Sequence, residues 1–194
     1  LKGGVGKTTL AVNLAWCAAV ASARRTLVWD LDPQAASSWL LGGDSAAIDR
    51  ARAVFAKEVA PAKLIVPTAF PRLDLLRADA SLRGLNAMLA DLGKRKRLAR
   101  LIDSVGNGYD RVILDCPPGL TETADQAVRA ADLIVVPVVP SPLSQRALGE
   151  VSAYLTREHG GHAPVLAVHA MVDRRRALHR AAVEARSEEH TSEL

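Results

Sequence analysis

Short runs of β-branched and other apolar residues alternate along the chain with longer segments of helical pattern. Five runs predict buried strands, at residues 26–30, 73–76, 111–115, 133–137 and 165–168. Between them, apolar residues recur every three or four positions, which predicts helices over 8–22, 81–104, 121–130, 144–158 and 177–185. This alternation predicts an α/β fold of three layers, with a doubly wound, mostly parallel sheet.

Acidic and polar residues follow three of these predicted strands. Asp30 and Asp32 come at the end of one strand, Asp115 at the end of another, and residues 137–141 after a third. Ligands of open parallel sheets bind beyond the carboxyl ends of the strands. We therefore expect the functional site at this edge. As alternatives, Asp30 and Asp32 cap a helix over 34–41, and Asp115 is a plain turn residue.

The composition narrows the class of protein. The 194 residues suit one domain, and 49% hydrophobic but only 4% aromatic residues predict an aliphatic core rather than a disordered chain or a fibre. Cys17 and Cys116 are too few for a disulfide scaffold, so we expect a reducing compartment and two packed thiols. No uncharged apolar run reaches the roughly 18 residues of a membrane span, so no membrane partner is expected.

A glycine-rich loop before the first predicted helix is the strongest signal. Its backbone N–H groups can face one anion, aided by the positive end of the helix dipole. The loop consists of Lys2, Gly3, Gly4, Val5, Gly6, Lys7, Thr8 and Thr9. In a phosphate loop, Lys7 would reach the β- and γ-phosphates and the Thr8 hydroxyl would bind Mg²⁺. A dinucleotide-binding turn fits less well, because that fold needs a small residue where Lys7, Thr8 and Thr9 stand.

The loop also departs from the general phosphate-loop pattern. Leu1 stands where that pattern has a glycine, and Lys2 with Gly3 and Gly4 defines a deviant form. Phosphate loops follow a buried strand, so we expect that a first strand before residue 1 is missing here.

Together with three further segments, the loop resembles the deviant Walker-A ATPases of the ParA/MinD family, and ParA-type partitioning ATPases in particular. The segments are residues 28–34, 113–119 and 136–144, which occur in the family's order and spacing, so that the resemblance covers residues 1–185. It implies a single P-loop NTPase domain over 1–185, with ATP and Mg²⁺ as cofactors and hydrolysis to ADP and phosphate.

The resemblance also implies roles for single residues. Lys2 resembles the signature lysine that reaches the partner's ATP across a dimer, and Asp32 resembles the residue that positions the attacking water. Lys2, Lys7 and Asp32 are thus the expected catalytic residues. Residues 3–9 are expected to bind the nucleotide, and the metal site is expected at Thr8, Asp30 and Asp115.

Two clusters of basic residues differ in their expected roles. The run at residues 94–97 is expected to form the solvated face of a helix. Non-specific binding of double-stranded DNA by ATP dimers is a property of the family, and phosphate contacts of this kind depend on salt rather than sequence. The candidates for these contacts are Arg174, Arg175, Arg176 and Arg180, with a solvated or nucleotide-proximal loop as the alternative.

The expected function is therefore an ATP-dependent homodimer that partitions DNA or similar cargo and is stimulated by a ParB-like partner. Such a protein would be cytoplasmic and nucleoid-associated. Three alternatives stay open: a MinD-like membrane-positioning ATPase, a reductase-type or metal-carrier ATPase of the same superfamily, and an inactive fragment.

The last nine residues break from the helical pattern before them. Residues 186–194 resemble the translation of a sequencing adapter, and we expect a non-native tail. Without them, one Arg and three Glu are lost and the formal net charge rises from +4 to +6, which favours the DNA-binding hypothesis.

Overall fold

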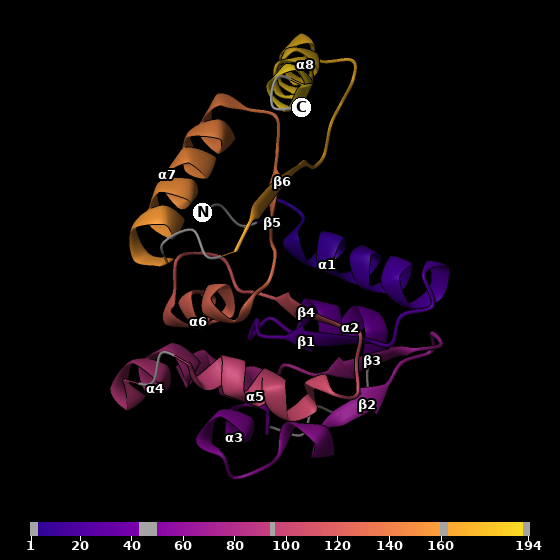
Figure 1. Ribbon diagram of the computed structural model, residues 1–194, viewed down its shortest axis with the longest axis vertical. Coiled ribbons are helices and arrows are strands. Elements are labelled where there is room, and N and C mark those ends of the chain that lie inside the picture. The colour runs from indigo at the N-terminus through magenta and orange to yellow at the C-terminus, as the bar shows by residue number, and fades with distance from the viewer. Residues whose placement is uncertain (1–3, 43–49, 94–95, 160–162, 192–194) are drawn as a thin grey trace. The chain divides into compact units, whose positions relative to one another are not determined.

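The computed structural model describes residues 4–42, 50–93, 96–159 and 163–191 (Figure 1). They form two compact units. The larger unit comprises Lys7–Ala130, and the smaller comprises the described residues up to Gly6 and from Ala131 onward. The single ATPase domain over 1–185 and the non-native tail stay predictions.

The larger unit alternates helices with strands. Helix α1 (Lys7–Trp16) continues into a short π-helix, η1 (Cys17–Ala21), and is followed by strand β1 (Thr26–Asp30). The next elements are α2 (Ala36–Gly42), α3 (Ala51–Ala56), the 3-10 helix η2 (Pro61–Lys63), β2 (Ile65–Pro67) and β3 (Leu73–Leu76). A second 3-10 helix, η3 (Ala80–Gly84), precedes α4 (Leu85–Leu92), α5 (Arg97–Gly106), β4 (Arg111–Asp115) and α6 (Glu122–Ala130).

The sheet of this unit has the strand order β2-β3-β1-β4. Strand β1 is central and pairs in parallel with β3 and β4, whereas β2 pairs with β3 in antiparallel fashion. The predicted strands at 26–30, 73–76 and 111–115 are confirmed at these bounds. Strand β2 was not predicted, because three residues ending in a proline are too short to show a period of two.

Helices cover both faces of this sheet, which confirms the predicted three-layer α/β arrangement (Figure 1). Leu27 and Trp29 of β1 pack in one buried cluster with residues of α3, α4 and α5. Val28 points to the opposite face, where it packs with Ala15 of α1 and Ala19 of η1. Successive strand residues point to opposite faces, so a central strand buried on both sides reads as the continuous apolar run seen in the sequence.

The helix predicted over 81–104 is wrong in its continuity. Helix α4 ends where Gly93 adopts a left-handed φ of 59°, and α5 begins at Arg97. A helix C-cap in this conformation favours glycine, which has no Cβ to clash. Arg97 also corrects the expected solvated face, because its side chain is buried and its Nε donates to the Phe55 carbonyl at 2.9 Å. Lys94 and Arg95 lie outside the described residues.

Cys17 is exposed, so its predicted place in the core is wrong. The buried residues on this stretch are Ala11, Ala15 and Ala19, spaced four apart. Cys17 lies two residues from both Ala15 and Ala19, which places it on the opposite side of the helix. Cys116, in contrast, packs against the cluster around Leu27 as predicted.

One buried carboxylate organises the elements that follow β3. Asp79 Oδ2 accepts hydrogen bonds from the backbone N–H groups of Arg50 (2.9 Å) and Ala51 (2.8 Å), where α3 begins. Its Oδ1 accepts from the Ser81 N–H at 2.9 Å and from the Ser81 hydroxyl. Burial alone would raise the pKa of Asp79, but these hydrogen bonds outweigh it and lower the pKa. Asp79 thus anchors α3 and η3 together.

The smaller unit has a two-stranded parallel sheet of β5 (Ile134–Val138) and β6 (Val165–His169). Its helices are α7 (Pro142–His159) and α8 (Ala177–Thr191). The strands and helices predicted here are found within a few residues of their expected bounds, except that α8 runs past residue 185, its predicted end.

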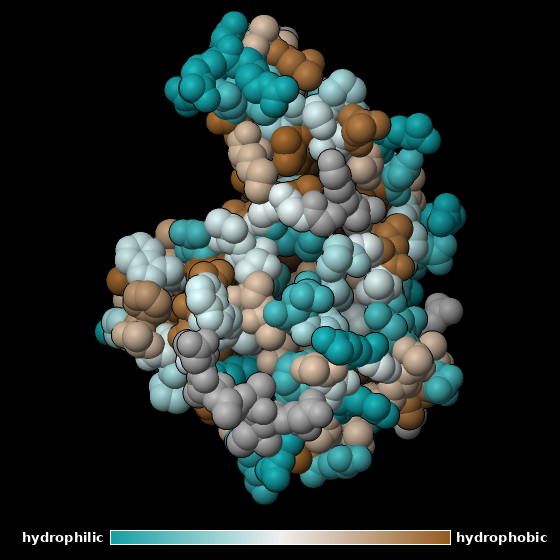
Figure 2. Space-filling view, turned by 180° about the vertical axis from the view of Figure 1, so that it is seen from behind, coloured by the Kyte–Doolittle hydropathy of each residue, from teal (hydrophilic) through white to brown (hydrophobic). Residues whose placement is uncertain are grey.

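Apolar surface is scattered among polar surface on the face in Figure 2. In the larger unit, Leu14, Trp16, Trp39 and Leu40 of α1 and α2 are exposed. No helix within the described ranges is both long and apolar enough to cross a membrane.

Candidate functional site

The glycine-rich loop leads directly into α1, as its sequence predicts. Gly4 and Gly6 adopt positive φ angles of 75° and 91°, a region that favours glycine. Lys7 is the first residue of α1, so the free N–H groups at the helix N-terminus are next to the loop. Lys2 and Gly3 lie outside the described residues, so their predicted roles rest on the sequence.

The ends of β1 and β4 bring two of the predicted carboxylates together. The parallel ladder pairs Asp30 with Asp115, and the Leu31 N–H donates to the Asp115 carbonyl at 2.9 Å just beyond it. Register partners lie on the same face of a sheet. Both carboxylates therefore lie on the face that α1 and α2 cover.

The Asp115 carboxylate is buried and incompletely satisfied. It is 2% exposed, and its Oδ2 has no hydrogen-bond partner among the described residues. Burial raises the pKa of Asp115, the Thr8 hydroxyl opposes this by hydrogen bonding, and the charges of Asp30 and Asp32 raise the pKa further. A buried oxygen without a hydrogen-bond partner costs free energy, so Asp115 can gain stability by binding a ligand that supplies the missing partner.

Asp30 is fully buried, but protein donors already surround it. Its Oδ2 accepts from the Ser38 N–H at 2.9 Å and from the Ser38 hydroxyl at 2.7 Å. Its Oδ1 accepts from the Asp32 N–H at 3.0 Å. Burial raises the pKa of Asp30, and the hydrogen bonds from Ser38 oppose the rise. Asp30 thus supports the first turn of α2, the alternative raised by its sequence position, while its role as a metal ligand stays a prediction.

Asp32 lies in the turn between β1 and α2 and is half-buried. Its Oδ1 accepts from the Gln34 N–H at 2.9 Å, and its carbonyl accepts from the Ala35 N–H at 2.8 Å. The turn therefore fixes the Asp32 backbone close to Asp115, whose pKa its charge raises. Its predicted role toward an attacking water remains a prediction.

The residues present fit a magnesium ion held mainly by a bound nucleotide. No three acidic, histidine or cysteine side chains come together as a metal site within the described ranges. Mg²⁺ usually keeps several waters and uses one or two protein oxygens together with substrate phosphates. The Thr8 hydroxyl and the unpaired Asp115 oxygen are suitable oxygens for such an ion.

Lys7 and Thr9 occupy the first turn of α1. The positive charge of Lys7 lies near enough to Cys116 to favour its thiolate, but desolvation dominates and raises the pKa of Cys116 to about 12. Burial therefore disfavours the thiolate, which is the reactive form of a cysteine. Thr9 is exposed, and its carbonyl accepts from the Asn13 side chain at 2.7 Å.

Sequence reasoning missed two serines at the start of α2. Ser37 and Ser38 are both buried. The Ser38 hydroxyl donates to Asp30 and accepts from the Ala78 N–H at 2.9 Å, which ties the ends of β1 and β3 together. Small hydroxyl residues in the first turn of a helix, shortly after two strand-end carboxylates, were the available signal.

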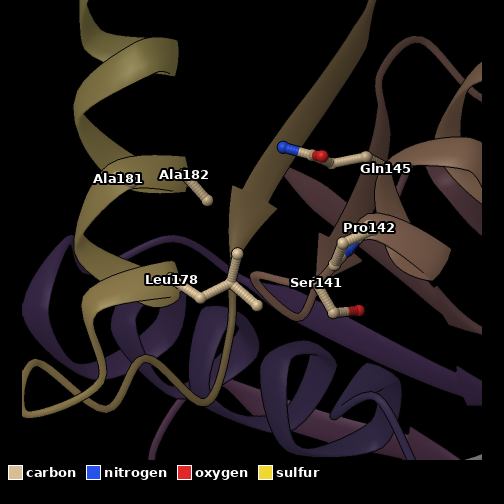
Figure 3. Close-up of a pocket in the computed structure, with 6 residues that line it drawn as sticks. All are labelled: Ser141, Pro142, Gln145, Leu178, Ala181 and Ala182. Carbon is tan, nitrogen blue, oxygen red and sulfur yellow. The ribbon is translucent and has the colours of Figure 1, made fainter.

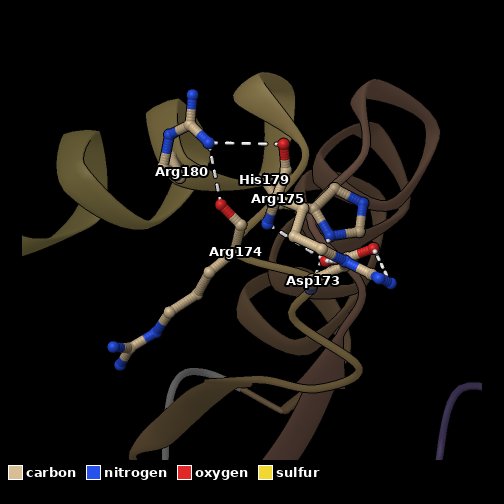
Figure 4. A network of polar contacts seen from close by, with 5 residues as sticks. All are labelled: Asp173, Arg174, Arg175, His179 and Arg180. Carbon is tan, nitrogen blue, oxygen red and sulfur yellow. Dashed lines mark hydrogen bonds and ion pairs between the residues drawn. The ribbon is translucent and has the colours of Figure 1, made fainter.

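The predicted DNA-binding arginines lie on the loop before α8 and on its first turns (Figure 4). Asp173 pairs with Arg175, with Nε to Oδ1 at 3.0 Å and Nη2 to Oδ2 at 3.2 Å. Arg180 donates to the carbonyls of Arg174 (2.8 Å) and Arg175 (3.3 Å). In Figure 4 the Arg174 side chain points away from this network.

The four arginines are therefore not equivalent. Arg175 is neutralised by Asp173, whose pKa the Arg175 hydrogen bonds lower, and Arg180 stabilises the loop. Arg174 and Arg176 are exposed, and neither side chain has a hydrogen bond or ion pair to another described residue.

The segment after β5 lines a small cavity in the smaller unit. The cavity, of about 220 Å³, lies between the start of α7 and the inner side of α8 (Figure 3). It is mainly apolar, and its lining consists of Ser141, Pro142, Gln145, Leu178, Ala181 and Ala182. Within the same unit, a Cβ built on Gly6 would lie 3.8 Å from Met171, so the segment after β6 lies next to Gly6.

The fold and the loop define the class as P-loop ATPases. A family model described as "AAA domain" matches residues 1–159. Among solved structures, the chain is similar to cobyrinic acid a,c-diamide synthase from Mycobacterium smegmatis with bound ATP analogue and magnesium. That match has a TM-score of 0.81 and 28% identity, and covers 96% of this chain and 78% of that one.

Two curated relatives specify the family further. The chain is 35% identical over 185 residues to the chromosome partitioning protein ParA of Caulobacter vibrioides (strain NA1000 / CB15N), covering 91% of this chain and 69% of that protein. It is 34% identical over 139 residues to the sporulation initiation inhibitor protein Soj of Bacillus subtilis (strain 168), covering 71% of this chain and 54% of Soj. The chain belongs to the ParA family of partitioning ATPases, and it spans about half the length of Soj.

Proposed function

We propose that this chain binds ATP with Mg²⁺ and hydrolyses it to ADP and phosphate. The observation that carries the proposal is the unpaired, buried oxygen of Asp115, at the end of β4, which lies beside the Thr8 hydroxyl in the first turn of α1. The synthase of Mycobacterium smegmatis, which is similar to this chain, was solved with an ATP analogue and magnesium.

Each residue of the proposed site has a part in phosphoryl transfer. Lys7 binds the β- and γ-phosphates, and residues 3–9 surround them with backbone N–H groups. Thr8 and Asp115 would hold Mg²⁺, which would supply positive charge near the phosphates. Asp32 orients the attacking water. Lys2 of a second copy supplies positive charge at the γ-phosphate, so hydrolysis depends on dimerisation.

We further propose that the ATP-bound dimer binds DNA non-specifically and partitions plasmid, chromosomal or similar cargo, with hydrolysis stimulated by a ParB-like protein. Such a dimer would act in the cytoplasm, on the nucleoid. The relationship to Caulobacter ParA and the exposed Arg174 and Arg176 support this proposal.

Nucleotide titration tests the first part. A fluorescent ATP analogue should bind the wild-type chain more tightly with Mg²⁺ than with EDTA, and Lys7→Ala should abolish binding. Exposed Lys57→Ala is a matched control, since it removes one lysine away from the loop. Equal binding with Mg²⁺ and with EDTA would contradict the metal site.

Light scattering tests the dimer. Asp32→Ala should accumulate as an ATP-bound dimer that does not turn over, whereas Lys2→Ala should bind ATP and stay monomeric. If Lys2→Ala dimerises and hydrolyses ATP like the wild type, the proposed role of Lys2 in the partner's site is wrong.

The salt dependence of DNA binding tests the basic loop. Replacing Arg174 and Arg176 by Ala should reduce the slope of log affinity against log salt by about two, one per phosphate contact. The control removes Arg146 and Arg157, which are exposed on α7 and paired with Glu150 and Glu158. Equal slopes for both double variants would exclude this loop as the DNA contact.

A further inference from the structure

Two buried polar atoms without partners lie at the same end of the sheet. They are the Ser37 hydroxyl oxygen and Asp115 Oδ2, each without a hydrogen bond to another described residue. Ser37 is completely buried and Asp115 is 2% exposed, so water does not freely replace the missing partners. Unsatisfied buried groups are rare in proteins, and each calls for an explanation.

The positions of these two groups follow from the backbone. Asp30 and Asp115 are register partners on β1 and β4, and α2 is fixed to this pair through Ser38, which bonds to Asp30. Ser37 immediately precedes Ser38. It is the second residue of α2 and is completely buried, so its hydroxyl lies close to this carboxylate pair.

Ser37 contrasts with its neighbour Ser38. The Ser38 hydroxyl is saturated, because it donates to Asp30 and accepts from Ala78. Asp30 already accepts three hydrogen bonds, whereas Asp115 Oδ2 accepts none from the described residues. The Ser37 hydroxyl has one proton to donate, and the carboxylate that lacks donors is Asp115.

We propose that Ser37 is a positioning residue of the metal site, whose hydroxyl donates to the Asp115 carboxylate when Mg²⁺ and nucleotide are bound. This inference rests on the proposed function. A second donor beside the carboxylate would fix its rotation and leave the other carboxylate oxygen free for the metal site. Groups behind a metal ligand act on affinity in this way, and their loss commonly costs about 10- to 100-fold.

The test compares Ser37→Ala with the wild-type chain in two measurements. The first is the Mg²⁺ concentration that gives half-maximal tight binding of ADP. Ser37→Ala should raise it about tenfold while ADP affinity in EDTA is unchanged. Ser37→Cys, of similar volume but a weak donor, should behave like Ser37→Ala.

The second measurement is the melting temperature without nucleotide. Ser37→Ala removes a hydroxyl that has no hydrogen-bond partner in the described part of the chain, so the melting temperature should stay the same or rise. Ser38→Ala is the matched control and should lower it, because it leaves the Ala78 N–H without its acceptor.

Three outcomes would overturn the inference. If the wild-type chain binds ADP without any Mg²⁺ dependence, the proposed function fails and the inference with it. If the wild type depends on Mg²⁺ and Ser37→Ala has the same half-maximal concentration, only the role of Ser37 fails. If Ser37→Ala lowers the melting temperature as much as Ser38→Ala does, the Ser37 hydroxyl is structural.

Discussion

Asp79 and Asp115 are both buried aspartates near the carboxyl ends of strands in one sheet, yet their surroundings differ. Asp79 accepts four hydrogen bonds from the protein, and its pKa is lowered. Asp115 has an oxygen without a partner among the described residues, and its pKa is raised. The same side chain at similar burial is thus saturated in one place and unsaturated in the other.

This difference separates structure from function within one sheet. A saturated carboxylate holds elements together and has little capacity left for a ligand, whereas an unsaturated one carries a cost that a bound ligand can remove. Proximity to a strand end alone does not distinguish the two cases, because both residues share it. The hydrogen-bond partners do.

Asp79→Ala should have the largest effect. It leaves the N–H groups of Arg50, Ala51 and Ser81 without their acceptor, and should lower the free energy of unfolding by about 3 kcal/mol in urea titrations. Asp91→Ala, at an exposed position on α4, should change it by less than about 0.5 kcal/mol. If both variants lost similar amounts of unfolding free energy, the effect would come from the lost negative charge and not from the hydrogen bonds that Asp79 accepts.

Asp115→Asn should behave in the opposite way. Without nucleotide, its free energy of unfolding should equal or exceed that of the wild type, because a buried, incompletely paired carboxylate is replaced by a neutral amide. Isothermal titration of ADP with Mg²⁺ should show at least about a tenfold weaker affinity. If the variant is less stable than the wild type and still binds ADP with Mg²⁺ normally, Asp115 has a structural role like that of Asp79.

The contribution of the Asp79 carboxylate to the free energy of unfolding should be lost in acid. Because the folded-state pKa lies below the ordinary value of 3.8, this contribution is complete well above pH 3.8 and is lost as the pH falls through the folded-state pKa. The difference in unfolding free energy between wild type and Asp79→Asn should therefore shrink when the urea titrations are carried out at pH 3 instead of pH 6. For one carboxylate, this difference changes by at most about 2.303RT for each pH unit. A constant difference over this range would contradict the lowered pKa.

Removing the hydrogen bond to Asp74 should have the smallest effect on the free energy of unfolding. This half-buried carboxylate on β3 accepts from the Tyr109 hydroxyl at 2.9 Å, and burial together with this bond raises the pKa of Tyr109 to about 12. Tyr109→Phe should cost about 1 kcal/mol of unfolding free energy. It should also remove the step near pH 12 from an absorbance titration of the tyrosines. If Tyr109→Phe instead removes a step near pH 10, the bond does not form in solution.

Much of the fold followed from periodicity, and each failed prediction has an identifiable physical cause. Residues 26–30 could be predicted as a strand because a strand that is buried on both faces appears in the sequence as a continuous apolar run. The break at Gly93 was hidden because apolar residues keep a helical spacing on both sides of it. Arg97 could not be predicted as buried, since its partner is the Phe55 carbonyl, far away in sequence.

The candidate site was partly predictable for a similar reason. The loop around Gly4 and Gly6 requires particular residues at particular backbone angles, so its sequence is informative. The adjacency of Asp30 and Asp115 followed from two strands ending at one edge. The sequence marks Ser37 and Ser38 alike, as hydroxyl residues in the first turn of a helix, and only their hydrogen-bond partners in the fold distinguish them.

The pairing of β1 with β4 also limits which insertions and deletions the chain tolerates. If β4 slipped by one residue against β1, Asp115 would turn to the opposite face, among the apolar residues that pack with Leu27 and Trp29. Length changes in the turn at residues 107–110 would leave Asp115 on its present face as long as this alignment survives, although they would disturb the bonds of Tyr109 and Asp110. The register of β1 and β4 therefore determines which face of the sheet Asp115 occupies, whatever the length of the loops between the strands.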